Sequence, residues 1–185
     1  MIIIGVTGTN GSGKGELTSH LTTKGFGFYS VRDFLVEEIE KRGLPVERPS
    51  MKAVADDLRT RFGASHIIES LYRRAEKSGK NAVIESVRTM GEVGFLKQQE
   101  NFLLVAVDAD LKIRYKRAVL RKSATDNVTF EKFAAQQEVE MKSDDPARMS
   151  LSDCIKAADV LLMNDGTMGE FRAQIDEKLS EYLAK

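Results

Sequence analysis

The feature that most constrains this chain is a glycine-rich run that lies between an apolar run and a helical pattern. The apolar residues Ile2–Val6 precede it, the segment Glu16–Thr23 follows it, and it consists of Gly8, Thr9, Asn10, Gly11, Ser12, Gly13, Lys14 and Gly15. Glycines let successive backbone N–H groups turn inward around an anion, and the amino terminus of the following helix adds its partial positive charge. A lysine at this offset supplies a mobile cation for the β- and γ-phosphates of a nucleotide. The run therefore predicts a phosphate-binding loop between a buried strand and a helix.

One position of this loop departs from the usual pattern. A Ser or Thr commonly follows the lysine and holds Mg²⁺, but here Gly15 stands at that position and Glu16 comes next. We expect either that Ser12 or Thr18 supplies the missing hydroxyl, or that water and phosphate oxygens hold most of the metal, as Mg²⁺ tolerates. Residues Gly8 to Glu16 are thus predicted to contact the nucleotide, with the metal ligands left open.

Short apolar runs without polar alternation recur along the chain. They are Ile2–Val6, Ala82–Ile84, Phe102–Val107 and Val160–Met163, with a further strand expected near Phe28–Ser30. Strands that are buried on both faces of a helix-covered parallel sheet have this composition. Helical patterns separate the runs, and two helix starts carry a Thr-x-x-Glu pattern, Thr89 with Glu92 and Thr167 with Glu170. The sequence therefore predicts a three-layer α/β fold with about five parallel strands and helices on both faces.

Two segments lack a convincing strand. Residues 32–78 show only helical patterns, broken at Gly43-Leu44-Pro45 and Pro49-Ser50, and are expected to form a helical insertion that binds the acceptor. Residues 122–148 are polar and mainly helical in composition, and are expected to form a short lid that excludes water from the site. Because the sequence has no internal repeat, low-complexity tract or long linker, residues 1–185 are expected to be one domain.

A second group of candidate residues follows the run Ala82–Ile84. Glu85 ends this run and Arg88 comes three residues later. An acid beside a phosphate loop can reach the water shell of a bound metal, and an arginine can bind a phosphate through two N–H groups. The run Phe102–Val107 also ends in an acid, Asp108. We prefer Glu85 because Arg88 accompanies it, and expect Asp108 to cap the following helix.

The helix expected over Asp110–Lys122 carries Arg114, Arg117 and Arg121 on one side. Its apolar face is expected to consist of Leu111, Tyr115 and Val119. Phosphoryl transfer depends on positioning and on cations more than on protein nucleophiles, so Arg117 and Arg121 are expected to neutralise the transferring group. Arg148, in the lid segment, is a weaker candidate.

Several of these elements occur in the order found in adenylate-kinase-related P-loop kinases, which the chain resembles over nearly its whole length. They are the phosphate loop, the stretch Glu85-Ser86-Val87-Arg88-Thr89, the helix with Arg117 and Arg121, and the ending Ala158-Asp159-Val160 to Asn164-Asp165-Gly166. The resemblance implies ATP as the phosphoryl donor, a requirement for Mg²⁺ with Glu85 ordering its water shell, and contact of Asn164, Gly166 and Arg117 with the donor nucleotide. Lys14 and the arginines would then be the catalytic cations.

The first half resembles nucleoside monophosphate kinases in particular. Their Asp-Gly-Phe-Pro-Arg-Thr stretch aligns with residues 85–89, which implies that Glu85 and Arg88 lie at the acceptor. Arg32 and Asp33 lie where those enzymes contact the acceptor from a helix start, and Asp33 is a candidate for orienting or deprotonating the attacking oxygen. The usual arginine of that helix is Val36 here, and Arg59 is the possible replacement.

The second half is similar to dephospho-CoA kinase. The stretch Val128-Thr129-Phe130-Glu131 through Gln136-Gln137, and the Asn-Asp-Gly ending, resemble the short helical lid and last strand of that family. The acceptor is therefore expected to be a nucleoside or deoxynucleoside monophosphate, with dephospho-CoA as the alternative.

An ATP-binding module that transfers no phosphate is a further hypothesis, because Gly15 and Glu16 weaken the metal site. A GTPase would need an Asn-Lys-x-Asp stretch, which the sequence lacks, and a motor ATPase would need a second acid beside Asp108, where Ala109 stands. The sequence thus favours a small-molecule kinase.

The composition limits the kinds of partner and site that we expect. The 28 basic residues balance 28 acidic ones, which argues against a protein that coats nucleic acid. The single cysteine, Cys154, excludes an internal disulfide framework and a cysteine-based zinc site. No apolar run approaches the roughly 20 residues of a membrane span, and the chain enters a hydrophobic strand without a leader pattern. We expect a cytoplasmic protein, monomeric or homodimeric, that acts on a small nucleotide-type molecule.

Overall fold

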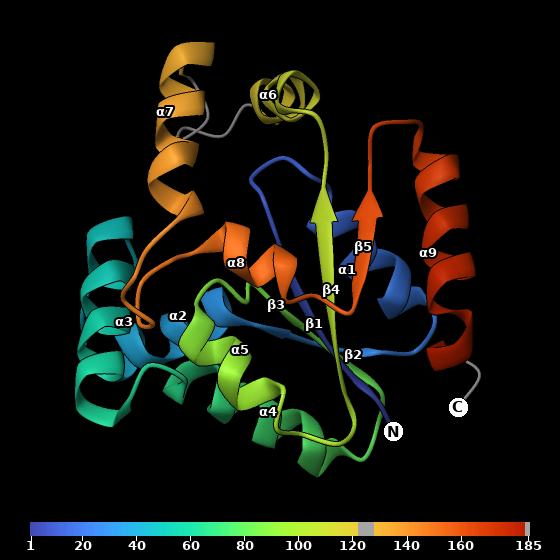
Figure 1. Ribbon diagram of the computed structural model, residues 1–185. Helices are drawn as coiled ribbons and strands as arrows, with labels where there is room; N and C mark the ends of the chain where they lie inside the picture. The colour runs from blue at the N-terminus through green and yellow to red at the C-terminus, as the bar shows by residue number, and fades with distance from the viewer. Residues whose placement is uncertain (122–127, 184–185) are drawn as a thin grey trace.

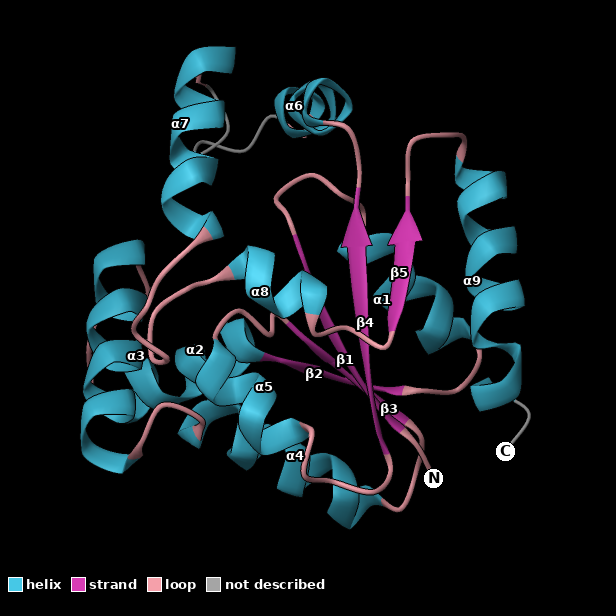
Figure 2. Ribbon diagram, viewed as in Figure 1, coloured by secondary structure: helices cyan, strands magenta, loops and turns pink. Residues whose placement is uncertain are grey.

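The computed structural model describes residues 1–121 and 128–183. Its five-stranded sheet is parallel throughout, with the strand order β2-β3-β1-β4-β5 (Figure 2). The strands are β1 (Ile3–Gly8), β2 (Gly27–Ser30), β3 (Ala82–Glu85), β4 (Phe102–Asp108) and β5 (Val160–Met163). All five lie where the apolar runs predicted them, and the predicted α/β class is confirmed.

Helices connect the strands and cover both faces of the sheet (Figure 1). Those before β4 are α1 (Lys14–Thr23), α2 (Val31–Lys41), α3 (Arg48–Phe62), α4 (His66–Ser78) and α5 (Met90–Leu96). Those after β4 are α6 (Leu111–Leu120), α7 (Phe130–Met141), α8 (Leu151–Lys156) and α9 (Met168–Leu183). Within the described residues, no helix combines the length and the apolar character that crossing a membrane requires.

The three central strands, β1, β3 and β4, are buried on both faces of the sheet, which explains why they have no polar alternation. Successive residues of β1 divide between the two sides: Ile3 packs in a core formed with α2, α3, α4, α5 and α8, and Ile4 in a core formed with α1 and α9. In β3, Ile84 packs on the first side and Val83 on the second. The two cores give the three layers that the sequence predicted.

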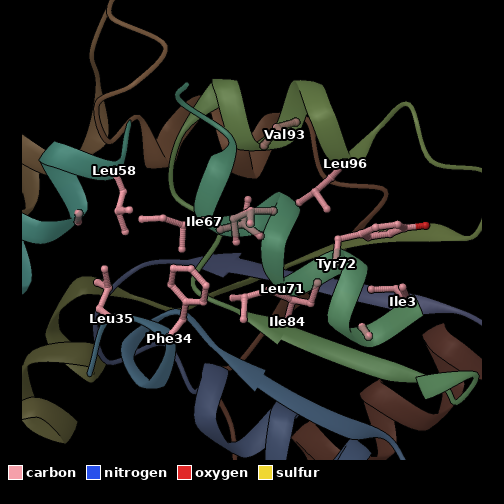
Figure 3. Close-up of a cluster of buried hydrophobic side chains, with 14 of the residues drawn as sticks. Ile3, Phe34, Leu35, Leu58, Ile67, Leu71, Tyr72, Ile84, Val93 and Leu96 are labelled. Atoms are coloured by element: carbon pink, nitrogen blue, oxygen red, sulfur yellow. The ribbon is translucent and has the colours of Figure 1, made fainter. Parts of the chain in front are cut away.

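The segment between β2 and β3 is entirely helical, as predicted, and is anchored to the sheet by an apolar cluster. Figure 3 shows Phe34 and Leu35 of α2, Leu58 of α3, and Ile67 and Leu71 of α4 converging in this cluster. All five side chains are at least nine-tenths buried. Burying one such side chain stabilises the folded state by about 1.5–3 kcal/mol, so the cluster holds α2, α3 and α4 against the sheet.

The predicted lid segment contains α7, while residues 122–127 of that segment lie outside the described residues. Helix α7 packs on α6 through Tyr115, whose ring lies 5.3 Å from that of Phe130 and 5.6 Å from that of Phe133. The apolar face expected for α6 is partly wrong, because Val119 is 44% exposed and Arg114 is buried. The physical reason is position: α6 lies beyond the carboxyl ends of the strands and not on a face of the sheet (Figure 1).

Candidate functional site

The phosphate loop connects the carboxyl end of β1 to the amino terminus of α1, as predicted. Three of its glycines have a positive φ, of 133° at Gly8, 79° at Gly11 and 106° at Gly13. A side chain at these positions would also collide with neighbours, because a Cβ would lie 2.0 Å from the Val107 carbonyl oxygen, 2.6 Å from that of Arg114 and 2.2 Å from Asn164 Nδ2, respectively. Both the conformation and the close packing of the loop therefore require glycine.

Lys14 reaches back over the loop that precedes it. Its Nζ donates hydrogen bonds to the carbonyl oxygens of Gly8, at 2.9 Å, and Thr9, at 2.7 Å. Burial is the main cause that lowers the pKa of Lys14 to about 8, and the nearby positive charge of Arg88 lowers it further. A desolvated ammonium held among carbonyl oxygens is prepared to bind an anion that replaces its lost water.

Four charged side chains lie near enough to Lys14 to act on its pKa. Arg88 and Arg121 lower its pKa, while Glu85 and Glu140 raise it. These residues come from the β3–α5 connection, the end of α6, the end of β3 and α7. The fold thus brings together Lys14, Glu85, Arg88 and Arg121, which the sequence had proposed as parts of one site.

Asn164 supports the phosphate loop from the loop that follows β5. Its side chain is 5% exposed, and its Nδ2 donates a hydrogen bond of 2.8 Å to the Ser12 carbonyl oxygen. Arg117 donates to the Asn164 carbonyl at 2.8 Å, to Asn164 Oδ1 at 3.3 Å and to the Gly166 carbonyl at 3.4 Å. The Asn164 amide is therefore committed to the protein, and contact of this loop with adenine stays a prediction.

The arginines of α6 differ in their roles. Arg121 donates a hydrogen bond of 2.8 Å to Asn10 Oδ1, at the tip of the phosphate loop. Arg114 is 4% exposed and donates through Nε to the Ala109 carbonyl at 2.7 Å, and it also contacts Gln137 of α7. Arg117 thus contacts the loop after β5, and Arg121 contacts the phosphate loop. Arg114 instead links α6 to the Ala109 backbone and to α7.

Asp108 does not cap α6, contrary to the sequence-based expectation. Asp110 is the cap and accepts from the backbone N–H groups of Lys112, at 2.9 Å, and Ile113, at 3.3 Å. Asp108 instead accepts a hydrogen bond of 2.6 Å from Thr9 Oγ1. The prediction failed because β1 and β4 are neighbours, so the Thr9 hydroxyl reaches Asp108 across the sheet edge.

The Glu16 carboxylate pairs with Arg172 of α9 at 2.6 Å, and an added Cβ at Gly15 would meet no atom within 4 Å. The hydroxyls considered as replacements donate to backbone carbonyls, Ser12 to Thr9 at 2.9 Å and Thr18 to Gly15 at 3.0 Å. None of these side chains is shown to be aimed at a metal.

Glu85, at the end of β3, is the carboxylate near the loop that the sequence proposed for the metal. It lies in register with Val6 of β1 and with Ser30 of β2. Across the described ranges, no cluster of three or more His, Cys, Asp or Glu side chains could hold a metal. Glu85 beside the phosphate loop fits a hard cation that keeps most of its water and phosphate ligands, as Mg²⁺ does.

The stretch that carries Arg88 is held in place by a buried carboxylate that the sequence analysis did not assign to the site. Glu92 is 1% exposed, and its Oε2 accepts hydrogen bonds from the backbone N–H groups of Arg88, at 2.8 Å, and Thr89, at 3.2 Å. Ser86, in the same stretch, has a φ of 77°, a strained conformation for a residue other than glycine. The Thr89-x-x-Glu92 pattern was the available signal, since it predicted the capping box that the structure confirms.

Arg59 joins this arrangement from α3. Its guanidinium lies 3.3 Å from Glu92 Oε1, and its Nε is buried without a hydrogen-bond partner. Burial raises the pKa of Glu92, while Arg59 and the two backbone N–H groups lower it. Arg59 therefore links the helical segment 32–78 to the Arg88 stretch.

Arg32 and Asp33 are both exposed, at the start of α2. The backbone N–H of Asp33 donates a hydrogen bond of 3.2 Å to Ser30 Oγ. Ser30 of β2 lies directly opposite Glu85 of β3 in the sheet. The two residues thus lie at the same edge of the sheet as Glu85, one strand further from the phosphate loop.

Residues 4–140 match the protein family described as AAA domain. The chain is 31% identical over 183 residues to a UPF0200 protein of Sulfurisphaera tokodaii, covering 98% of this chain and 97% of that protein. It is 29% identical over 191 residues to the UPF0200 protein TK1334 of Thermococcus kodakarensis, covering 100% of both.

Solved structures share the fold at low sequence identity. TT1252 from Thermus thermophilus gives a TM-score of 0.66 at 18% identity and covers 97% of both chains. Shikimate kinase from Bacteroides thetaiotaomicron gives 0.58 at 14% identity, over 97% of this chain and 98% of the enzyme. Dephospho-CoA kinase from Campylobacter jejuni gives a TM-score of 0.54 at 13% identity and covers 97% of this chain and 96% of the enzyme. The overall arrangement is that of P-loop kinases.

Proposed function

The chain belongs to the AAA domain family, and from this membership and its P-loop kinase fold we propose that it is an ATP-dependent small-molecule kinase. The proposed reaction moves the γ-phosphoryl group of ATP to a nucleotide-type acceptor, a nucleoside or deoxynucleoside monophosphate. One observation carries the proposal: the desolvated Lys14 lies over a glycine loop that Arg121 contacts at its tip, and Arg88, from another part of the fold, lies near enough to lower the pKa of Lys14. Cations that converge from separate elements on one space suit a transferring phosphoryl group.

On the donor side, the backbone N–H groups of Gly11 to Gly15 and the Lys14 ammonium bind the ATP phosphates. The hydrogen bonds of Lys14 to the loop carbonyls are exchanged for bonds to phosphate oxygens. Arg121, held at the loop tip by Asn10, and Arg117, held by the Asn164 loop, neutralise negative charge as the phosphoryl group moves.

A divalent cation, when bound, supplies charge neutralisation between the β- and γ-phosphates. Glu85 is the residue proposed to hold it, through water. Thr9 and Ser12 keep their hydroxyls within the loop through bonds to Asp108 and to the Thr9 carbonyl, so their part is to maintain the loop's shape.

On the acceptor side, the helical segment 32–78 is proposed to bind the acceptor. Arg88 binds its phosphate through the side chain while Glu92 holds its backbone. Arg59, whose guanidinium pairs with Glu92, is proposed as a further cation at the acceptor. Arg32 and Asp33, exposed at the start of α2, are proposed to contact the far side of the acceptor, with Asp33 orienting the attacking oxygen. Segment 122–148 is proposed to close over the site.

Two other functions remain as alternatives. Dephospho-CoA as the acceptor fits the similarity of the fold to a dephospho-CoA kinase, and its hydroxyl would make a base such as Asp33 more important. A module that binds ATP without transfer fits the pairing of Glu16 with Arg172 and the lack of a hydroxyl at Gly15.

The test is ADP release from ATP and Mg²⁺ with AMP, CMP, dCMP, UMP, GMP, dTMP, dephospho-CoA or shikimate, each against a reaction without acceptor. Shikimate is included because shikimate kinase shares the fold. A rise with a monophosphate supports the proposal and names the acceptor, and Lys14→Ala should remove that rise while the circular dichroism spectrum stays unchanged. A rise with dephospho-CoA or shikimate alone assigns the other acceptor, and ATP binding without any rise contradicts kinase activity.

A further inference from the structure

The connection between α7 and α8, residues 142–150, contacts the stretch that carries Arg88. In Figure 1 it runs from the lower end of α7 past α3 to α8. The backbone N–H of Ser150 donates a hydrogen bond of 3.0 Å to the Arg88 carbonyl oxygen, and Thr89 forms an antiparallel bridge with Met149. Arg88 and Met149 are thus neighbours, although they lie 61 positions apart in the chain.

Local hydrogen bonds and close packing fix the position of this connection. The Asp145 carboxylate accepts a hydrogen bond of 2.9 Å from the backbone N–H of Ala147, which closes a turn. The backbone N–H of Gly91, in α5, donates to the Pro146 carbonyl oxygen at 3.0 Å. A Cβ at Gly91 would lie 2.8 Å from the Ala64 Cβ and 3.0 Å from the same carbonyl oxygen. The connection is therefore held tightly against the start of α5.

The main chain of Arg88 is held from two sides, and its side chain rests on Met149. Its N–H donates to Glu92 Oε2 at 2.8 Å, and its carbonyl oxygen accepts from Ser150. Its guanidinium Nη1 lies 3.7 Å from Met149 Sδ, a distance that suits a weak hydrogen bond to sulfur. Within the part of the chain that the structure describes, no carboxylate forms an ion pair with Arg88. The thioether of Met149 is thus the polar partner of a cation that no acid neutralises.

A thioether can orient a guanidinium without cancelling its charge. Sulfur is a weak, uncharged acceptor, and the flexible methionine side chain adapts to the group that lies on it. A carboxylate at this place would hold Arg88 more strongly, but it would also repel a phosphate that approached the same cation. Met149 is 38% exposed, so the pair borders solvent, from which an anion can reach it.

We propose that Met149 is a positioning residue of the acceptor site, which orients the Arg88 guanidinium and leaves its charge available for an anionic group. The proposal rests on the function proposed above, which assigns Arg88 to the acceptor phosphate. The connection between α7 and α8 then forms one side of the acceptor site, and the side chain at Met149 has to be uncharged.

The first test needs no turnover. The Nε–H signal of Arg88 in the NMR spectrum is assigned with Arg88→Lys and followed in the ligand-free protein and during titration with inorganic phosphate. Nitrogen relaxation should show a restrained Nε–H group in the native protein and a mobile one in Met149→Ala. Phosphate should move the signal saturably in the native protein and should bind about tenfold more weakly to Met149→Glu.

Leu161 offers matched controls for these variants. It is an apolar residue with 41% exposure, close to that of Met149, and it lies on β5, which β1 and β4 separate from β3. Leu161→Ala should leave the Arg88 Nε–H group restrained, and Leu161→Glu, which adds the same charge as Met149→Glu, should leave the phosphate titration unchanged.

The second test uses the acceptor that the ADP-release assay identifies. Met149→Glu should raise the KM for this acceptor about tenfold, while the KM for ATP stays near its native value. Met149→Leu keeps the size of the side chain and removes the sulfur, so it should raise the acceptor KM about threefold, the effect of losing one weak contact.

Four outcomes would overturn the positioning role. They are an Arg88 Nε–H group that is equally restrained in Met149→Ala and the native protein, a native Arg88 signal that phosphate does not move, a phosphate affinity that Met149→Glu leaves unchanged, and a rise of both KM values together. If the ADP-release assay finds no acceptor, the proposed kinase activity is contradicted instead, and the NMR measurements still decide whether Met149 positions Arg88.

Discussion

The side-chain amide of Asn164 donates a hydrogen bond of 2.8 Å to the Ser12 carbonyl oxygen, although the two residues are 152 positions apart in the chain. This bond lets the loop after β5 support the phosphate loop after β1. Arg117 extends the same contact through its bonds to Asn164, so a residue proposed to act on phosphate also holds the loop that supports the phosphate site.

Asn164→Ala should weaken both the fold and ATP binding. The substitution leaves the Ser12 carbonyl without its partner in a buried place, which costs about 1–3 kcal/mol of unfolding free energy. Denaturant unfolding and equilibrium binding of ATP measure the two effects. Asn101→Ala, at an exposed turn residue, is the control and should lie within about 0.5 kcal/mol of the native protein. Native-like ATP affinity in Asn164→Ala would contradict the supporting role.

Lys14 should make the stability of the ligand-free protein depend on alkaline pH. Burial lowers its pKa from 10.5 to about 8, so between these values the unfolded chain binds more protons than the folded one. The free energy of unfolding therefore rises with pH across this window, and below pH 8 the full cost of burying the charge is present. Relative to Lys14→Met, the native protein should be less stable at pH 7 by about 1–3 kcal/mol and should approach the variant by pH 10.5. Parallel stability curves for the two proteins would show that Lys14 is not desolvated.

Gly15 should accept a side chain, in contrast to the three loop glycines with positive φ. A Cβ there meets no atom within 4 Å, and its φ is not positive. Gly15→Ala should stabilise the start of α1 by up to about 1 kcal/mol. Gly15→Ser adds the hydroxyl that the metal site lacks, so it should lower the Mg²⁺ concentration for half-maximal ATP binding relative to Gly15→Ala.

The comparison of Ser with Ala isolates the hydroxyl from the helix effect. Equal Mg²⁺ dependence in the two variants would mean that position 15 does not face the metal. Gly13→Ala serves as the opposite control and should disrupt the loop, because a Cβ at Gly13 lies 2.2 Å from Asn164 Nδ2.

Glu92 should matter both for stability and for the acceptor. In Glu92→Gln, an amide replaces a buried carboxylate that accepts from Arg59 and from two backbone N–H groups. The free energy of unfolding should fall by about 3 kcal/mol, as it does when a buried ion pair is broken. Adding Arg59→Met to Glu92→Gln should recover part of this stability, since the unpaired guanidinium is then removed. Glu100→Gln, at an exposed position, is the matched control.

Activity gives the second readout for this pair. If Glu92 positions Arg88, the KM for the acceptor should rise in Glu92→Gln with little change in the KM for ATP, measured at a temperature where the variant is folded. An equal rise in both values would indicate a general loss of structure.

Much of the fold could be predicted because its signals are local. The runs Ile2–Val6 and Ala82–Ile84 form strands whose apolar residues face alternately into the two cores, which leaves no room for polar ones. The glycines of the phosphate loop and the Thr89–Glu92 capping box could likewise be identified, because each depends on residues close together in the chain. The helical nature of segment 32–78 followed from the same local patterns.

The contacts that shape the site could not be predicted in this way. Thr9 with Asp108, Glu16 with Arg172, and Arg59 with Glu92 join residues that only the strand order β2-β3-β1-β4-β5 and the packing of the helices bring together. Asp108 was expected to cap a helix, because it directly precedes that helix in sequence, whereas Asp110 is the cap. The sequence by itself determined the strands, the phosphate loop and the helical character of segment 32–78, since these depend on backbone conformation and nearby side chains. The tertiary structure alone decided which carboxylates pair with the phosphate loop and which with other helices, because a charged side chain takes the partner that lies within reach after the sheet has formed.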